Sequence, residues 1–165
     1  MAAVVGMASG AAAFGCAKDQ AQASEAPARA SVGVGEAQAA SSEAGQSAYE
    51  ETEFKLRIEP VGTYKAKEPG SAQIVLEAKS GFKCNDKYPY KYKLEKTEGL
   101  RFGSEVIRQE SVEVSKSKSV MKLDFVPESA GKKQLEGTFY FSVCTDDKCL
   151  VERRKLSLGI SVGES

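Results

Sequence analysis

Most of the chain consists of short runs in which apolar and polar residues alternate, separated by turn-forming residues. In the last run, Leu156, Leu158, Ile160 and Val162 occupy every second position. Alternation with a period of two places successive side chains on opposite faces of a β-strand. No stretch has a helical period of the usual length, so the pattern predicts an all-β protein. The runs span residues 54–58, 72–78, 88–94, 106–114, 120–126, 138–143 and 150–162.

About seven short strands with turn signals between them predict an immunoglobulin-like antiparallel β-sandwich. Two markers of a true immunoglobulin domain are missing. The sequence contains no tryptophan, and Tyr140 precedes Cys144 by four residues, whereas the tyrosine of a tyrosine corner lies closer to its cysteine. We therefore expect the sandwich architecture without the buried disulfide of that family.

The first 16 residues are small or apolar and carry no charge, which resembles a secretory signal. Residues 13–16, Ala-Phe-Gly-Cys, resemble a bacterial lipobox, which implies lipidation of Cys16. The match departs in two respects: Ala13 stands where a larger aliphatic residue is usual, and no Lys or Arg precedes the apolar run. Lipidation would anchor the protein in a membrane. The alternative is a small-residue tail with an unmodified cysteine. Ala17 and Lys18 follow Cys16. By resemblance to bacterial lipoproteins, this favours a location in the cell envelope, facing the periplasm and anchored in the outer membrane rather than the inner one.

Residues 17–50 are rich in Ala, Ser, Gly, Gln and Glu and contain almost no large apolar side chains. Such a segment buries too little surface to offset its ordering entropy, which predicts a disordered linker. A flexible linker of this length has a root-mean-square span of roughly 30 Å. We therefore expect a signal segment at 1–16, a linker at 17–50 and one folded domain at 51–165.

The composition excludes several classes of function. The sequence has 23 basic and 23 acidic residues, so its formal net charge is zero, and we expect no nucleic-acid partner. It contains no histidine, which excludes histidine acid–base catalysis, Ser-His-Asp triads and His-ligated metals. No apolar run reaches the roughly 18 residues of a membrane span. We expect no cofactor.

The candidate chemistry lies in a hairpin near the end of the sequence. Cys144 and Cys149 enclose the turn-forming residues Thr, Asp, Asp and Lys, so the two sulfurs should flank the turn on neighbouring strands. Residues opposite each other on antiparallel strands lie about 4.5–5.5 Å apart at Cα, within disulfide range. Asp146 and Asp147 would disfavour a thiolate here, whereas Lys148 would favour it.

Three interpretations of this cysteine pair remain open. It can exchange with the thiols of another protein, which requires an accessible sulfur. It can also be a structural disulfide, which is common in secreted proteins. Metal binding is the weakest interpretation, because two cysteines without a histidine make a poor zinc site. A loop this short gains little from chain entropy, which favours the exchange interpretation.

Cys84 is the third cysteine of the predicted domain. It can be a buried apolar residue, a free thiol, a resolving partner for the hairpin cysteines, or half of an intermolecular bridge. Burial is the commonest case for a lone cysteine. The aromatic residues of the strands can shield the cysteine pair, but alternation places most of them in the core. These aromatic residues are Tyr88, Tyr90, Tyr92, Phe139, Tyr140 and Phe141.

Residues 72–96 and 137–162 resemble the N-terminal periplasmic domain of DsbD thiol:disulfide interchange proteins. The most specific part is the spacing of Tyr140, Cys144 and Cys149 before a charged and then alternating strand, and a looser match is Gly-Phe at 81–82 followed by Tyr-Pro-Tyr-Lys at 88–91. The resemblance covers roughly residues 53–163. It departs at residues 150–153, Leu-Val-Glu-Arg, where many relatives carry prolines.

The resemblance implies an immunoglobulin-like sandwich with two redox cysteines that flank a late turn. It further implies electron relay between a membrane donor and periplasmic thiol oxidoreductases. No membrane conduit follows the domain in this sequence, so we expect the donor to be a separate protein. The resulting hypothesis is an envelope thiol–disulfide exchange module, which would be an oxidoreductase. The alternative is a non-catalytic, lipid-anchored binding module in which the disulfide is structural.

Overall fold

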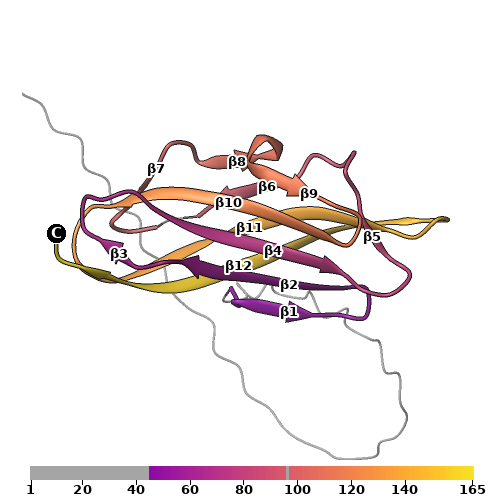
Figure 1. Cartoon of the computed structure of the whole chain (residues 1–165), viewed down its shortest axis with the longest axis horizontal. Coiled ribbons are helices and arrows are strands. Elements are labelled where there is room, and N and C mark those ends of the chain that lie inside the picture. Colours follow the sequence, from indigo (N-terminus) through magenta and orange to yellow (C-terminus); the bar gives the residue numbers. More distant parts are fainter. Residues whose placement is uncertain (1–44, 96) are drawn as a thin grey trace, which may run out of the picture. The chain divides into compact units, whose positions relative to one another are not determined.

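A computed structural model describes residues 45–95 and 97–165 of the chain, which form an immunoglobulin-like β-sandwich (Figure 1). The first sheet has the order β1-β2-β4-β10-β7, with β9 also paired to β10. Its strands are β1 (Ala48–Glu50), β2 (Phe54–Val61), β4 (Gly70–Ala78), β7 (Leu100–Phe102), β9 (Val112–Val114) and β10 (Lys118–Pro127).

The second sheet has the order β3-β12-β11-β6-β8, with β5 also paired to β11. All its strand pairs are antiparallel except β3 with β12. Its strands are β3 (Tyr64–Lys65), β5 (Lys83–Cys84), β6 (Lys91–Leu94), β8 (Val106–Arg108), β11 (Gly131–Cys144) and β12 (Cys149–Gly163). The long hairpin of β11 and β12 therefore forms the middle of this sheet.

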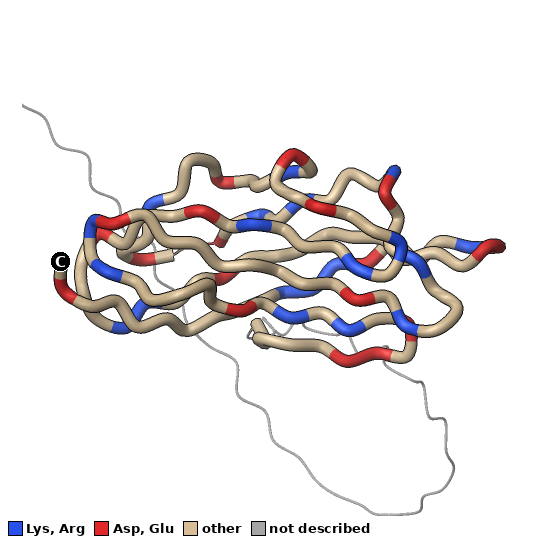
Figure 2. The backbone as a smooth tube through the Cα atoms, viewed as in Figure 1, with Lys and Arg blue, Asp and Glu red and all other residues tan. Residues whose placement is uncertain are grey.

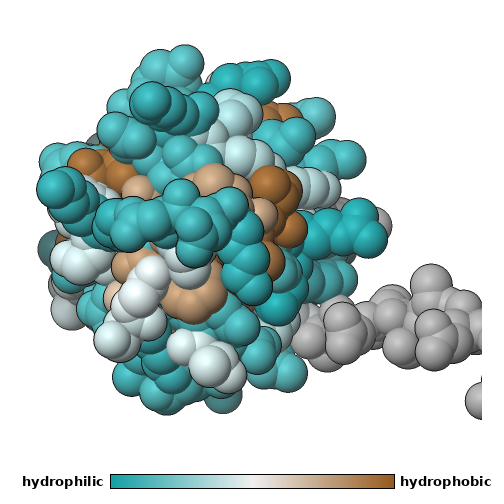
Figure 3. Space-filling model, turned by 90° about the vertical axis from the view of Figure 1, so that its right-hand side faces the viewer, coloured by the Kyte–Doolittle hydropathy of each residue, from teal (hydrophilic) through white to brown (hydrophobic). Residues whose placement is uncertain are grey.

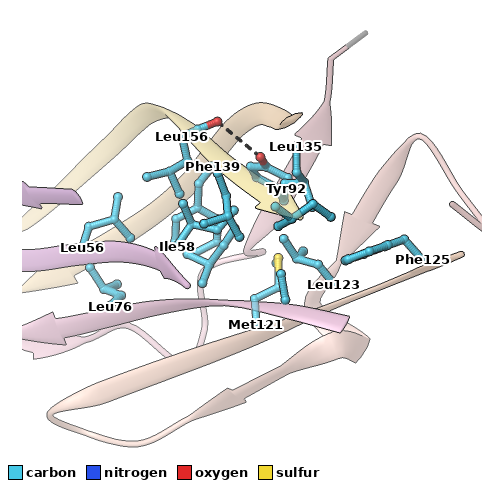
Figure 4. Packing of buried hydrophobic residues seen from close by; sticks show 14 of the residues in the cluster. Leu56, Ile58, Leu76, Tyr92, Met121, Leu123, Phe125, Leu135, Phe139 and Leu156 are labelled. Atoms are coloured by element: carbon cyan, nitrogen blue, oxygen red, sulfur yellow. Dashed lines mark hydrogen bonds between the residues drawn. The ribbon is translucent and has the colours of Figure 1, made fainter. Parts of the chain in front are cut away.

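The core lies between the two sheets and is made by the alternating apolar positions. Phe54 of β2 meets Phe141 of β11 edge to face, with ring centroids 4.9 Å apart. Tyr92 is fully buried, and its hydroxyl donates a hydrogen bond to the Leu156 carbonyl at 3.5 Å. Figure 4 shows this part of the core, whose labelled side chains are Leu56, Ile58, Leu76, Tyr92, Met121, Leu123, Phe125, Leu135, Phe139 and Leu156.

Gly137 in the middle of β11 allows Tyr92 to lie across that strand. A Cβ atom at position 137 would lie 2.5 Å from the Lys93 carbonyl oxygen and 2.6 Å from Cζ of Tyr92. Neither the backbone nor a fully buried ring can move away easily, so a side chain does not fit at this position.

The predicted fold class is confirmed, but one predicted strand is wrong. Residues 106–114 do not form a single strand. The 3₁₀ turn η1 (Gln109–Ser111) separates β8, which pairs with β6, from β9, which pairs with β10. The segment therefore crosses from one sheet to the other, which explains its weak alternation.

The folded region also begins before the predicted boundary at residue 51. The sheet includes Ala48–Glu50, three residues whose composition assigns them to the linker. The hydroxyl of Tyr49 donates a hydrogen bond to the Lys155 carbonyl at 2.7 Å, so this aromatic side chain fastens the short strand to β12. Residues 45–47 of the predicted linker are also described, and Gln46 forms a bridge to Leu156. The rest of the predicted linker, residues 17–44, the signal segment and Cys16 lie outside the described residues.

Candidate functional site

The predicted hairpin is present, and its two cysteines form a disulfide. All 14 residues of β11 pair with β12 in one continuous register, and Cys144 opposite Cys149 is the last pair. The two Cα atoms lie 4.0 Å apart, closer than the expected separation of opposite residues. The turn is closed by a hydrogen bond from the Thr145 amide to the Lys148 carbonyl at 2.8 Å. The Thr145 hydroxyl accepts hydrogen bonds from the amides of residues 147 and 148.

The two cysteine residues of the disulfide differ in exposure. Cys149 is exposed and Cys144 is half-buried. The Asn85 side-chain amide approaches the Cys149 sulfur at 4.0 Å, and the Ser142 hydroxyl lies 3.9 Å from the Cys144 sulfur. The hairpin tip lies at the end of the sandwich on the right of Figure 1, and Figure 3 shows that this end is mostly hydrophilic with separate hydrophobic areas. The disulfide therefore lies at the surface on its Cys149 side.

The charges at the hairpin tip differ from the sequence-based expectation because of Lys83. This lysine lies opposite Cys144 on β5, and its ammonium group binds the Asp146 carboxylate at 2.5 Å. The hydrogen bond and charge of Lys83 lower the pKa of Asp146 below its ordinary value. Within the described residues, Asp147 and Lys148 form no ion pair and are exposed. One of the two predicted carboxylates is therefore balanced by a cation that is remote in sequence.

Cys84 lies in the core, in the position expected of a buried structural cysteine. It is 6% exposed and lies opposite Val143, so it faces the interior, whereas Cys144 is on the other face of β11. Burial raises the pKa of the Cys84 thiol. The hydroxyl of Ser119 is also buried there and has no hydrogen-bond partner among the described residues. Cys84 is not brought together with the hairpin pair.

The aromatic side chains divide as alternation predicts. Tyr90, Tyr92, Phe139 and Phe141 are buried in the core. Tyr88 is half-buried and meets Tyr90 edge to face at 6.0 Å, whereas Tyr140 lies on the outer face beneath Lys91, whose Nζ is 4.6 Å from the ring centroid. Most of these rings therefore pack in the core against the sheet that carries the disulfide.

The described part of the chain contains no cluster of three or more residues that could hold a metal ion. Among the same residues, no helix is long and apolar enough to cross a membrane. The arrangement is thus an immunoglobulin-like sandwich with a surface disulfide at the tip of a long central hairpin.

No family model and no curated protein matches the sequence. Three solved structures are similar in backbone. A cohesin module from a Clostridium perfringens family 33 glycoside hydrolase is 10% identical, with 70% of this chain and 100% of that chain covered and a TM-score of 0.41. The PapD-like domain 7 of human CEP192 is 12% identical, with 69% of this chain and 87% of that chain covered and a TM-score of 0.33. AggA, the major subunit of Escherichia coli aggregative adherence fimbriae type I, is 8% identical, with 66% of this chain and 93% of that chain covered and a TM-score of 0.36. At these values the three similarities carry no argument about function.

Proposed function

We propose that the domain is a thiol–disulfide exchange module that relays electrons through a reversible Cys144–Cys149 disulfide. The observation that carries the proposal is the position of the bond. It joins the last pair of a hairpin whose strands already pair along 14 residues, and one of its two cysteine residues is exposed. Because the strands pair without it, a bond placed there is not needed to hold the hairpin together, and it lies at the surface where a partner can approach it. The resemblance to the DsbD N-terminal domain supports the same function.

The exchange would begin at Cys149, the more exposed of the two cysteines. A thiolate of the partner attacks the Cys149 sulfur, the bond to Cys144 breaks, and Cys144 leaves as a thiolate that takes up a proton. The second thiol of the partner, as its thiolate, then attacks the partner's own sulfur in the mixed disulfide and releases Cys149. The domain gains two electrons and two protons, and the partner is left with a disulfide. The reverse sequence reduces the partner.

The nearby groups are consistent with this reaction. The Ser142 hydroxyl lies close enough to the departing Cys144 sulfur to donate a weak hydrogen bond to its thiolate. Lys83 lies opposite Cys144 and supplies a positive charge, although this charge is shared with Asp146. The periplasmic location in this proposal depends on residues 1–16, which lie outside the described part of the chain.

Reduction of the folded protein by dithiothreitol tests the proposal against the structural-disulfide alternative. Samples are taken during reduction, alkylated and analysed by mass spectrometry. We expect Cys144 and Cys149 to become labelled while Cys84 stays unlabelled, because Cys84 is buried and reports whether the domain has unfolded. If Cys84 instead becomes labelled together with Cys144 and Cys149 at the rate of unfolding, the bond is structural and the binding-module function is favoured.

A further inference from the structure

One backbone edge of β12 pairs with β11, and the other edge faces away from β11. The other edge is partly covered by segments from elsewhere in the sandwich. Gln46 donates a backbone hydrogen bond to the Lys155 carbonyl at 3.3 Å and accepts one from the Ser157 amide at 3.0 Å. Farther along, the Ala66 amide donates to the Gly163 carbonyl at 2.9 Å. The odd-numbered residues of β12 therefore point their amide and carbonyl groups away from β11.

The same edge is open beside the disulfide. Because the β11–β12 register has no bulge, Cys149, Val151 and Arg153 point their backbone groups in the same direction as Lys155. Within the described residues, no backbone group pairs with them on this side. One side-chain contact occurs there, a hydrogen bond of 3.0 Å from the Arg154 guanidinium to the Arg153 carbonyl. We call residues 149–153 the free edge.

The side chains of the free edge define a chemical pattern. Val151 is 64% exposed, and Arg153 is also exposed on the same outer face. Unpaired strand edges of this kind bind extended peptides by adding a strand to the sheet. In such an addition, the residues of the new strand that lie beside Val151 and Arg153 are two positions apart.

Basic side chains form a row on the outer face that ends at Arg153 of the free edge. The register places Arg153, Tyr140, Lys91 and Arg108 in one row across four neighbouring strands. Among the described residues, none of these three cations lies in an ion pair. On the opposite face, the Glu152 carboxylate is already bound by Arg154 at 2.6 Å. Figure 2 shows the distribution of basic and acidic positions along the backbone. A carboxylate beside Arg153 therefore meets a cation that has no ion-pair partner among the described residues.

We propose that the free edge binds an extended segment of the partner oxidoreductase, which adds a strand to the second sheet with an apolar side chain beside Val151 and a carboxylate beside Arg153. Such a strand brings the backbone of the partner next to Cys149, the exposed cysteine of the disulfide. The proposal rests on the proposed function for the identity of the partner. The strand addition itself is measured without a redox readout.

Two synthetic peptides test the strand addition on the full chain. In the first peptide, threonine alternates with valine and glutamate, and in the second, lysine replaces glutamate. Peptide binding is followed by backbone amide NMR and hydrogen exchange. We expect the amides of Val151 and Arg153 to shift and to exchange more slowly with the glutamate peptide. We also expect the lysine peptide to bind about five- to tenfold more weakly, because like charges on neighbouring strands repel.

Matched proline variants separate edge pairing from other binding. Val151→Pro removes an outward-pointing amide and should weaken binding of the glutamate peptide about tenfold or more. Gly159→Pro removes an outward-pointing amide on the same strand away from the free edge and should leave binding unchanged. If Val151→Pro does not fold, Arg153→Glu provides the test, because it should reverse the preference between the two peptides.

Three results would overturn the strand addition: equal affinity of Val151→Pro and Gly159→Pro, an unchanged peptide preference in Arg153→Glu, or amide shifts confined to elements other than β12. These results are independent of the redox assay. If the peptide binds but the disulfide of the folded protein resists reduction, the docking site is supported and electron relay is rejected. If the disulfide of the folded protein is reduced but the peptide does not bind, electron relay is supported and this docking mode is rejected.

Discussion

Replacing both Cys144 and Cys149 by serine should abolish exchange with a dithiol protein and leave the sandwich folded. The disulfide joins residues five positions apart, and in the chain-entropy model a loop of this length accounts for about 2 kcal/mol of stability. The hairpin remains paired along the rest of β11 without the bond. We therefore expect a loss of about 2 kcal/mol or less in the free energy of unfolding, measured by urea denaturation, and no transfer of electrons to or from a thioredoxin-type dithiol.

The control for this experiment is Cys84→Ser, which removes the remaining thiol of the domain. Because Cys84 is buried and faces away from the pair, this variant should exchange as the unchanged protein does. Two results would argue against the account. One is a double variant that fails to fold, which would make the disulfide a structural requirement. The other is loss of exchange in Cys84→Ser, which would make Cys84 part of the reaction.

Replacing Phe141 by alanine should destabilise the domain by about 3–5 kcal/mol. Phe141 is fully buried, stacks on Phe139 with centroids 5.3 Å apart and meets Phe54 of the opposite sheet at 4.9 Å. The substitution removes aromatic contacts on both sides and leaves a cavity between the sheets. Urea denaturation measures the change, and many domains have only about 5–15 kcal/mol of stability in total.

Tyr140 provides the matched control, because it is the adjacent residue on the outer face of the same strand. Its ring is half-buried and lies beneath Lys91. Tyr140→Ala removes an exposed cation–π contact worth about 0.5–1 kcal/mol and some partly buried surface. We expect a much smaller loss than for Phe141→Ala. Equal losses would mean that the two faces of β11 are not distinguished as the alternation of its residues indicates.

The sequence was sufficient to predict the sandwich because its longer strands alternate strongly. β2, β4, β10 and β12 each contain an alternating run that the pattern identifies. The first half of β11 was missed because residues 131–137 contain a single large apolar side chain, Leu135. The short strands β3, β5 and β7 were missed for a different reason. They contain two or three residues, which are too few for a period, and they form only because the neighbouring sheet supplies their hydrogen bonds.

The candidate site was predictable where it is local in sequence. The hairpin cysteines and their turn lie within six consecutive residues, so turn chemistry indicates their pairing. Lys83 could not be assigned to the site, because its contact with Asp146 spans 63 residues and depends on the pairing of β5 with β11. The free edge could not be predicted either. It depends on which parts of β12 are covered by Gln46 and β3.

The reduction potential of the Cys144–Cys149 pair in the folded domain is the most direct test of electron relay. It is measured in a glutathione or dithiothreitol series read by thiol alkylation, with Cys16 and Cys84 replaced by serine so that only the pair contributes thiols. We expect a potential within the roughly −180 to −270 mV span of exchange proteins. A potential well below about −300 mV, together with slow reduction, would contradict it and identify a structural disulfide.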